Sequence, residues 1–128
     1  MQEHWNIERY KQYKRKQRSK YGAKKTETDG YKFDSIAERR RYEQLRLLQE
    51  LGCITELKLQ PHYLLQEHFR KNGKTYKKIE YIADFQYIEN GKTIIEDVKG
   101  LETEVFKIKR KMFEYKYPEL ELKIVKEV

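Results

Sequence analysis

Residues 81–100, YIADFQYIENGKTIIEDVKG, contain two strand-like runs joined by the pair Asn90-Gly91. Asn-Gly between apolar runs is a strong short-range signal for a β-hairpin, because both residues readily adopt the positive φ angles of a tight turn. The pattern predicts Asp84 on the first strand and Asp97 and Lys99 on the second. Residues two apart on a strand share a face, so the hairpin gathers two carboxylates and one amine.

Two carboxylates held close together repel each other, and burial makes the repulsion more costly unless a partner neutralises them. A divalent cation removes this conflict, and oxygen ligands suit Mg²⁺, which often binds beside phosphate oxygens. A lysine at the same place can hold an attacking water or offset charge that builds up on a phosphate. The alternative is an ordinary pair of charged residues, Asp97 and Lys99, on a solvated strand, because D-x-K is common by chance.

The composition indicates a polyanionic partner. The chain has 128 residues, which is enough for one domain with a modest core. Charged residues make up 39% of the chain, the formal net charge is +8 and 11 residues are tyrosine. Lys and Arg release counter-ions from phosphate backbones, and tyrosines pack on sugars or bases, so we expect a nucleic acid partner.

The positive charge is concentrated in a basic arm, residues 1–30, which precedes a predicted globular domain at residues 31–128. The arm contains nine Lys or Arg against four Asp or Glu, and few residues that could form a core. We expect it to order only on a partner chain or on nucleic acid. Its candidate nucleic acid contacts are Lys14, Arg15, Lys16, Arg18, Lys20, Lys24 and Lys25.

Several classes of protein are disfavoured by what the chain contains. A single cysteine, Cys53, rules out an intrachain disulfide and is typical of a reducing compartment. The three histidines show no spacing typical of a structural zinc site. No apolar run approaches the roughly 18 residues of a membrane span, and the N-terminus lacks a signal-peptide core. We therefore expect a soluble cytoplasmic protein with no membrane association.

Apolar spacing and turn residues predict the remaining elements. They are a helix at 35–51, strands at 54–59, 63–69, 76–87 and 93–99, a second helix at 103–117 and a final strand at 120–125. An α/β sandwich with one helix on each face of a mixed sheet would bury the apolar sides of these elements. The predicted fold class is therefore α/β.

Four stretches of the chain occur in the order of a known fold. They are YKFDSIAERRRYEQLRLL, ELKLQPHYLL, YIADFQYIENGKTIIEDVKG and TEVFKIKRKMFEYKYP, and they cover most of residues 31–118. Together they resemble the PD-(D/E)xK nuclease superfamily, and most closely its small phage-encoded proteins, long catalogued as a domain of unknown function and regarded as Holliday junction resolvase-like endonucleases. The resemblance implies a restriction-endonuclease-like core, a mixed sheet flanked by helices in αβββαβ order with an extra strand.

The resemblance also implies the roles of particular residues. Glu38 occupies the acidic position of the family's opening helix, Asp84 is the aspartate of the "PD" half, and Asp97 and Lys99 form the (D/E)-x-K half. The implied cofactor is Mg²⁺, or alternatively Mn²⁺, held by Asp84, Asp97, the Val98 carbonyl and Glu38. Lys99 is then the residue that positions the nucleophile.

Two positions depart from the pattern or allow a second interpretation. Ala83 stands where the family has proline, which is a backbone preference and not a ligand. Glu38 also fits a capping box with Ser35, in which the glutamate accepts from the first free N–H of the helix. One side chain cannot fully serve both roles, so both interpretations of Glu38 stay open.

Some polar and aromatic residues have weaker assignments. Gln60 ends a predicted strand and is either a plain strand end or a contact to substrate or metal-bound water. Lys109 matches a basic position of the family, where it reaches a phosphate, but a solvated helix face explains it equally well. Tyr76, Tyr81 and Tyr87 recur at strand spacing, and we expect them to pack in the domain rather than to stack on bases.

The implied activity is that of a metal-dependent endodeoxyribonuclease that makes paired symmetric nicks in branched double-stranded DNA, such as four-way junctions, and leaves 5′-phosphates. A four-way junction has approximate two-fold symmetry, so we predict a homodimer. A phage-encoded member would act in the cytoplasm of a bacterial host. Two alternatives stay open: a non-catalytic basic module that binds DNA or RNA, and a nuclease of another target, such as a nickase or a transposase end-cutting subunit. A pure binder has no reason to place two acids where they repel phosphate.

Overall fold

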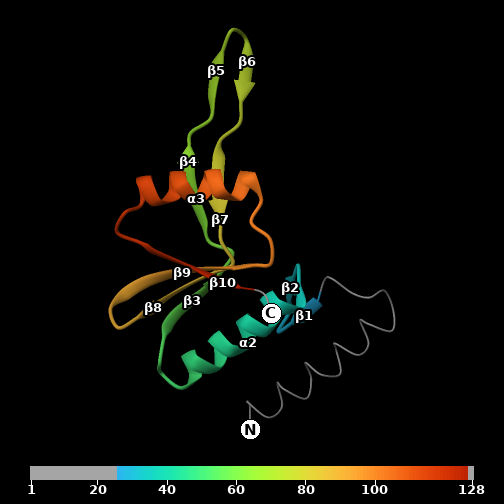
Figure 1. Ribbon diagram of the computed structural model, residues 1–128, viewed down its shortest axis with the longest axis vertical. Helices are drawn as coiled ribbons and strands as arrows, with labels where there is room; N and C mark the ends of the chain where they lie inside the picture. Colours follow the sequence, from blue (N-terminus) through green and yellow to red (C-terminus); the bar gives the residue numbers. More distant parts are fainter. Residues whose placement is uncertain (1–25, 127–128) are drawn as a thin grey trace. The chain divides into compact units, whose positions relative to one another are not determined.

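The computed structural model describes residues 26–126 (Figure 1). These residues belong to two compact units, which divide between Ile54 and Thr55 and are described separately below. Most of the predicted basic arm, including all seven of its candidate contacts between positions 14 and 25, lies outside the described residues. Neither helix in residues 26–126 has the length and apolar character needed to cross a lipid bilayer.

In the described part of the first unit, a short hairpin is followed by one helix. Strands β1 (Thr26–Thr28) and β2 (Tyr31–Phe33) pair antiparallel, and helix α2 (Ile36–Glu50) follows them. The turn Asp29-Gly30 has φ angles of 55° and 83°, which suit Gly and, among other residues, Asp or Asn. Tyr42 on α2 packs its ring against both aromatic residues of β2, with centroids 5.7 and 5.2 Å apart. The hairpin therefore shares a small aromatic core with α2.

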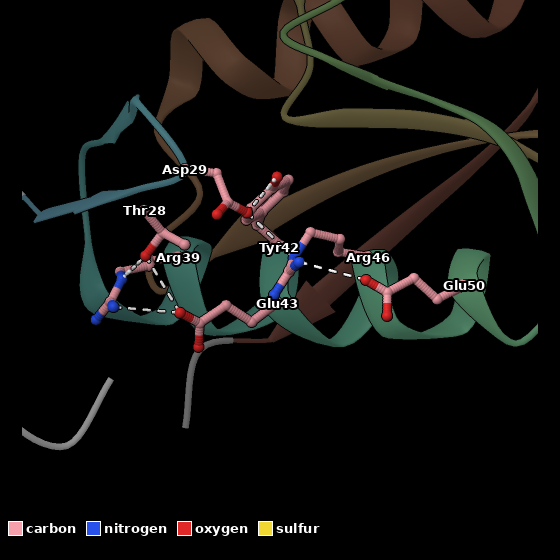
Figure 2. Close-up of polar contacts among 7 residues, drawn as sticks. All are labelled: Thr28, Asp29, Arg39, Tyr42, Glu43, Arg46 and Glu50. Atoms are coloured by element: carbon pink, nitrogen blue, oxygen red, sulfur yellow. Dashed lines mark hydrogen bonds and ion pairs between the residues drawn. The ribbon is translucent and has the colours of Figure 1, made fainter. Parts of the chain in front are cut away.

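Polar contacts also tie this hairpin to α2. The Tyr42 hydroxyl donates to the Asp29 carboxylate at 3.0 Å, and the Arg46 guanidinium lies 3.1 Å from that carboxylate. Arg39, which is 2% exposed, pairs with Glu43 at 3.2 Å, and burial raises the pKa of the Glu43 carboxyl. The residues of this network are Thr28, Asp29, Arg39, Tyr42, Glu43, Arg46 and Glu50 (Figure 2).

The second unit is built on a mixed sheet. Its strand order is β10 (Glu121–Lys126), β9 (Lys92–Lys99), β8 (Phe85–Glu89) and β3 (Thr55–Leu59). The pairs β3·β8 and β8·β9 are antiparallel, whereas β10 runs parallel to β9. Parallel neighbours need a crossover connection, and helix α3 (Glu104–Lys116) supplies it. The described chain is thus a mixed α/β protein with a mixed sheet and two helices.

Between β3 and β8 the chain makes a long excursion. Strands β4 (His62–Gln66) and β7 (Ile79–Ile82) form an antiparallel pair, and β5 (Phe69–Lys71) and β6 (Lys74–Tyr76) form a second pair beyond it. In Figure 1 the β5–β6 hairpin continues the β4–β7 pair at its end farthest from the mixed sheet. This excursion accounts for four of the strands in the second unit.

The core of the second unit lies between α3 and the strands. Phe113, which is fully buried, packs its ring 5.1 Å from Tyr63 and 5.2 Å from Tyr81. The Tyr117 hydroxyl after α3 donates to the Leu64 carbonyl at 2.8 Å. The buried members of this core are Tyr63, Leu65, Tyr81, Ala83, Ile95, Phe106 and Phe113.

The predicted strand at 76–87 was wrong as a single element, and the predicted strand at 63–69 ends early. The chain forms β6, β7 and β8 in the first region, with a bend at Ala83-Asp84, and β4 ends at Gln66. The physical reason is a change of partner, because β7 pairs with β4 whereas β8 pairs with β3 and β9. The other predicted elements agree with the structure to within one residue. Since α2 belongs to the first unit, a helix on each face of the sheet stays a prediction.

Candidate functional site

Asp84 lies in the bend between β7 and β8, and not on a strand as the sequence pattern predicted. Its backbone N–H donates to the Glu96 carbonyl at 3.1 Å, and its carbonyl accepts from the Gln60 N–H at 2.9 Å. Its carboxylate oxygen Oδ2 accepts from the Val98 N–H at 2.7 Å. The bonds to Glu96 and Val98 hold the backbone and the carboxylate of Asp84 against β9, and the bond from Gln60 ties its carbonyl to the residue after β3.

Asp97 lies on β9 and is 2% exposed. Its Oδ2 accepts from the Tyr81 hydroxyl at 2.5 Å, and its Oδ1 lies 3.5 Å from the Lys99 Nζ. The structure therefore brings Asp84, Asp97, Val98 and Lys99 together at one end of the β8–β9 hairpin. The Lys99 side chain is 28% exposed, so its amine faces both the buried carboxylate and solvent.

Tyr81 is a site residue that the sequence did not reveal. Burial raises the pKa of its hydroxyl, and the nearby Asp97 and Asp84 carboxylates raise it further. The hydroxyl therefore stays protonated at neutral pH and serves as a donor that fixes the rotation of the Asp97 carboxylate. Tyr81 was expected to pack, which it also does, but no motif links it to Asp97, because the two residues belong to different strand pairs.

Helix α3 borders the site with a second cation. The Lys99 Nζ lies 4.5 Å from the centroid of the Phe106 ring, and the Arg110 guanidinium lies 5.2 Å from the same ring. Arg110 also pairs with Glu102 at 3.2 Å. Lys109, the predicted phosphate contact, is half-buried and is turned roughly 100° around the helix from Arg110. The structure thus adds Arg110 to the positive charges around Phe106, and Lys109 stays a prediction.

Glu96 lies on the opposite face of β9 from Asp97. It is fully buried and accepts a hydrogen bond from the Tyr87 hydroxyl. Adjacent acids on one strand therefore have separate surroundings, as strand alternation requires.

Glu38 lies in the first turn of α2, in the first unit. Its N–H donates to the Ser35 hydroxyl at 3.0 Å, and its carboxylate accepts from the Asp34 N–H at 3.3 Å. This is a capping arrangement in which the glutamate reaches one residue further back than the capping box predicts. Asp84 and Asp97 belong to the second unit, so a shared metal site with Glu38 stays a prediction.

The donor set of the second unit fits a magnesium ion. Throughout residues 26–126, no group of three or more His, Cys, Asp or Glu side chains is placed to hold a metal. Asp84 and Asp97 nevertheless supply two hard oxygen donors, and the Val98 carbonyl is the predicted third. Mg²⁺ commonly binds one or two carboxylates and completes its shell with water and phosphate oxygens. Two carboxylates held by backbone and tyrosine donors are compatible with that mode of binding.

The fold and the site define a mixed α/β protein with two carboxylates and a lysine at one end of a β-hairpin. The chain belongs to the family described as "Protein of unknown function (DUF1064)", whose family model matches residues 18–128. No curated protein and no solved structure matches the chain. The family match includes the whole of the described structure and every residue of the site.

Proposed function

We propose that this protein is a metal-dependent endodeoxyribonuclease of the PD-(D/E)xK type that cuts branched DNA. The observation that carries the proposal is the convergence of Asp84, Asp97 and Lys99, in which Asp97 is buried between the Tyr81 hydroxyl and the Lys99 amine. A buried carboxylate beside a second one is costly unless a cation compensates it. A partly exposed lysine at the same place can face a phosphate.

The order of elements along the chain supports a restriction-endonuclease-like core. The elements α2, β3, β8, β9, α3 and β10 follow the αβββαβ order, with β4 to β7 as an insertion between the first and second core strands. The central hairpin of that core is β8–β9, and Asp84 and Asp97 lie at one end of it. This is the place where the superfamily's metal ligands are expected.

In the proposed reaction, Asp84, Asp97 and the Val98 carbonyl would hold Mg²⁺, or Mn²⁺ in its place, with Glu38 as a further ligand or as a residue that orients water. A bound divalent ion supplies Lewis acidity and lowers the pKa of a coordinated water. Lys99 positions the attacking water and offsets the negative charge that develops on the phosphate. Cleavage of the bond between phosphorus and the 3′ oxygen leaves a 5′-phosphate.

The roles of the neighbouring donors follow from their bonds. The Val98 N–H fixes the Asp84 carboxylate, and the Tyr81 hydroxyl fixes that of Asp97, so neither carboxylate needs to reorganise when a cation binds. Preorganisation of this kind lowers the cost of assembling the site. Tyr81 is therefore a positioning residue in the proposed mechanism.

The proposed target is a four-way junction or a similar branched DNA, and the proposed active form is a homodimer. Two sites related by a two-fold axis match the approximate symmetry of a junction and allow two paired cuts. Light scattering of the purified protein should give twice the mass of the chain, and with a junction it should give that mass plus the mass of one junction. One chain per junction would contradict paired cutting by one assembly.

One observation favours a competing function, a nucleic-acid-binding module without catalysis. The Asp97 carboxylate already has a hydrogen bond from Tyr81 and an ion pair with Lys99, so its charge is partly compensated within the chain. In that case the cluster only stabilises the fold. The two functions differ in whether wild-type protein cuts DNA at all and, if it does, in whether the loss of the Asp97 charge abolishes the cleavage.

The test is incubation of an end-labelled immobile four-way junction, beside a linear duplex of the same sequence, with Mg²⁺, with Mn²⁺ or with EDTA. Wild-type protein should nick the junction symmetrically in the presence of either ion, and Asp97→Asn should bind the junction without cutting it. Glu89→Gln is the matched control, because Glu89 is an exposed acid on the same hairpin. A wild-type protein that cuts no DNA with either ion, or an Asp97→Asn variant that cuts as fast as wild type, would refute the proposal.

A further inference from the structure

The β5–β6 hairpin is an exposed two-stranded ribbon with a rigid turn. Residues 66–78 are all exposed. The Asn72-Gly73 turn has φ angles of 54° and 75°, as a tight type I′ hairpin turn requires. The backbone register of the ribbon is therefore fixed while its side chains reach solvent.

The ribbon carries a concentrated positive charge. Residues 68–78 contain five Lys or Arg and no Asp or Glu, so this stretch alone has a formal charge of +5. Lys78 is partly compensated by Glu80, whose carboxylate lies 3.6 Å from its amine. The remaining charge has no acidic neighbour within the stretch.

The two faces of the ribbon differ in what they do. Arg70 lies opposite Thr75 and donates to its hydroxyl at 2.6 Å and to the Gly73 carbonyl at 3.2 Å, so this face stabilises the turn. On the other face, Phe69 lies opposite Tyr76 and Lys71 lies opposite Lys74, because directly opposed residues share a face. That face, named here the ring-and-lysine face, consists of Phe69, Lys71, Lys74 and Tyr76.

The ring-and-lysine face leaves two unfavourable features in water. Like charges directly opposite each other, such as Lys71 and Lys74, destabilise a strand pair. The Phe69 and Tyr76 rings stack with centroids 4.7 Å apart and 10° between their planes, yet each residue remains 40% exposed. The prediction that Tyr76 packs in the core of the domain was therefore wrong, because its strand belongs to the exposed ribbon. The ring stack and the Lys74 amine, 5.1 Å from the Tyr76 ring centroid, stabilise this short ribbon, but the opposed lysines and the exposed ring surface remain open to a partner.

A nucleic acid relieves both features at once. Its phosphates neutralise the opposed lysines, and the flat surfaces of its sugars and unpaired bases cover aromatic rings. A β-ribbon also fits the major groove of B-DNA. An acidic peptide would neutralise the lysines but offers no flat partner for the two rings.

We propose that the ring-and-lysine face binds DNA, with Lys71 and Lys74 on backbone phosphates and the Phe69 and Tyr76 rings on a base or sugar exposed at a branch point. The preference for a branch rests on the proposed nuclease function. The assignment of the ring-and-lysine face as a DNA-binding surface rests only on the charge, register and exposure of the ribbon. The face is separate from the Asp84 and Asp97 cluster and can be tested without cleavage.

The test measures binding of the full chain to a fluorescent four-way junction and to a linear duplex by anisotropy, in EDTA and over a series of salt concentrations. In Lys71→Gln/Lys74→Gln we expect a plot of log affinity against log salt to be shallower by about 1.8, because each phosphate contact contributes about 0.9 to the slope. If wild type and variant bind equally well at 1 M salt, a difference in slope of about 1.8 makes the variant bind about 30-fold more weakly at 0.15 M salt. The variant Lys71→Arg/Lys74→Arg keeps both charges and should bind with the affinity and salt slope of wild type.

Matched controls separate the hairpin from net charge. Lys92→Gln/Lys123→Gln removes two exposed strand lysines elsewhere in the second unit and should bind as wild type does. Phe69→Leu/Tyr76→Leu should keep the wild-type salt slope but weaken junction binding by about 5- to 150-fold for each base that loses its stack, with a smaller effect on linear duplex.

The outcomes distinguish this inference from the proposed function. Wild-type affinity and slope in the Lys71→Gln/Lys74→Gln variant would overturn it, as would an equal loss in the Lys92→Gln/Lys123→Gln control. Because binding is measured in EDTA, a loss confined to the hairpin variants upholds the inference even if wild-type protein cuts no DNA. Conversely, if the wild-type protein cuts junctions and the hairpin variants bind DNA as wild type does, the nuclease proposal stands and the proposed DNA-binding role of the ring-and-lysine face is refuted.

Discussion

The substitution Tyr81→Phe tests whether the Asp97 carboxylate depends on a tyrosine donor. Tyr81 is 2% exposed, and its hydroxyl donates to Asp97 at 2.5 Å. Phenylalanine keeps the ring contacts with Phe113 and Phe106, whose centroids lie 5.2 and 6.2 Å away. The change therefore removes one hydroxyl and little else.

The size of the effect follows from the burial of Asp97. A hydrogen bond to a charged group contributes about 1.5–3 kcal/mol to the free energy of unfolding. Asp97 is 2% exposed, so water has little access to replace the lost donor, but Lys99 still lies 3.5 Å from the other carboxylate oxygen. We therefore expect the free energy of unfolding to fall by about 2 kcal/mol, a large share of the roughly 5–15 kcal/mol typical of a whole domain.

Urea denaturation of wild type, Tyr81→Phe, Asp97→Ala and the double variant gives the coupling between the two residues. We expect a coupling energy of at least about 1 kcal/mol, because each single variant already removes the same hydrogen bond. Tyr63→Phe is the control, since the Tyr63 hydroxyl donates to the neutral Gln86 amide and should show no coupling to Asp97. Strictly additive effects of Tyr81→Phe and Asp97→Ala, or a loss in Tyr81→Phe below about 0.5 kcal/mol, would refute the reasoning.

Three further predictions concern the helix cap, the arm and the turn. Glu38→Gln keeps an oxygen for the capping bond, so the melting temperature should hold while cleavage falls about 10- to 100-fold; unchanged cleavage would leave Glu38 with capping alone. Deletion of residues 1–25 removes nine Lys or Arg and should flatten the salt dependence of DNA binding, whereas an unchanged slope would exclude phosphate contacts from the arm. Gly91→Ala places a side chain at φ 78° and should lower the free energy of unfolding by about 1–2 kcal/mol in urea titrations, and wild-type stability would contradict a strained turn.

The helices could be predicted from the sequence because their end signals are local. Ser35 and Thr103 are N-caps that accept from the backbone three residues on, at 3.0 and 3.1 Å. Gly52, with φ 80°, follows the first helix, and Pro118 follows the second. Each of these signals depends only on neighbours in the sequence, so tertiary structure did not override them.

Part of the site could also be predicted from local rules. The Asn90-Gly91 turn sets the register of β8 and β9, and alternation then places Asp97 and Lys99 on one face. The Tyr81 contact could not be predicted, because it joins β7 to β9, which belong to different sheets. The position of Arg110 beside the site likewise could not be predicted, because it depends on how α3 packs.

The bend at Asp84 explains why the longest predicted strand failed. Tyr81, Ala83, Phe85 and Tyr87 alternate as if they formed one buried face of one strand. Tyr81 and Ala83 do share a core with Ile95, but Phe85 lies opposite Glu96, on the other face of the sheet from Ile95. The alternation therefore changes face between residues 83 and 85, and periodicity alone cannot reveal this change.

The pattern conceals the change because both faces of β9 are buried from Ile94 to Asp97, so an apolar residue suits either side. Because of the bend, the Asp84 side chain belongs to neither of the two faces on which strand residues alternate. Its N–H and carbonyl bond to Glu96 and Gln60, and its carboxylate is free of strand alternation to turn to the Val98 N–H. In a continuous strand, alternation alone would fix the direction of that carboxylate. The change of sheet partner that made the predicted strand wrong therefore also brings Asp84 to the backbone beside Asp97.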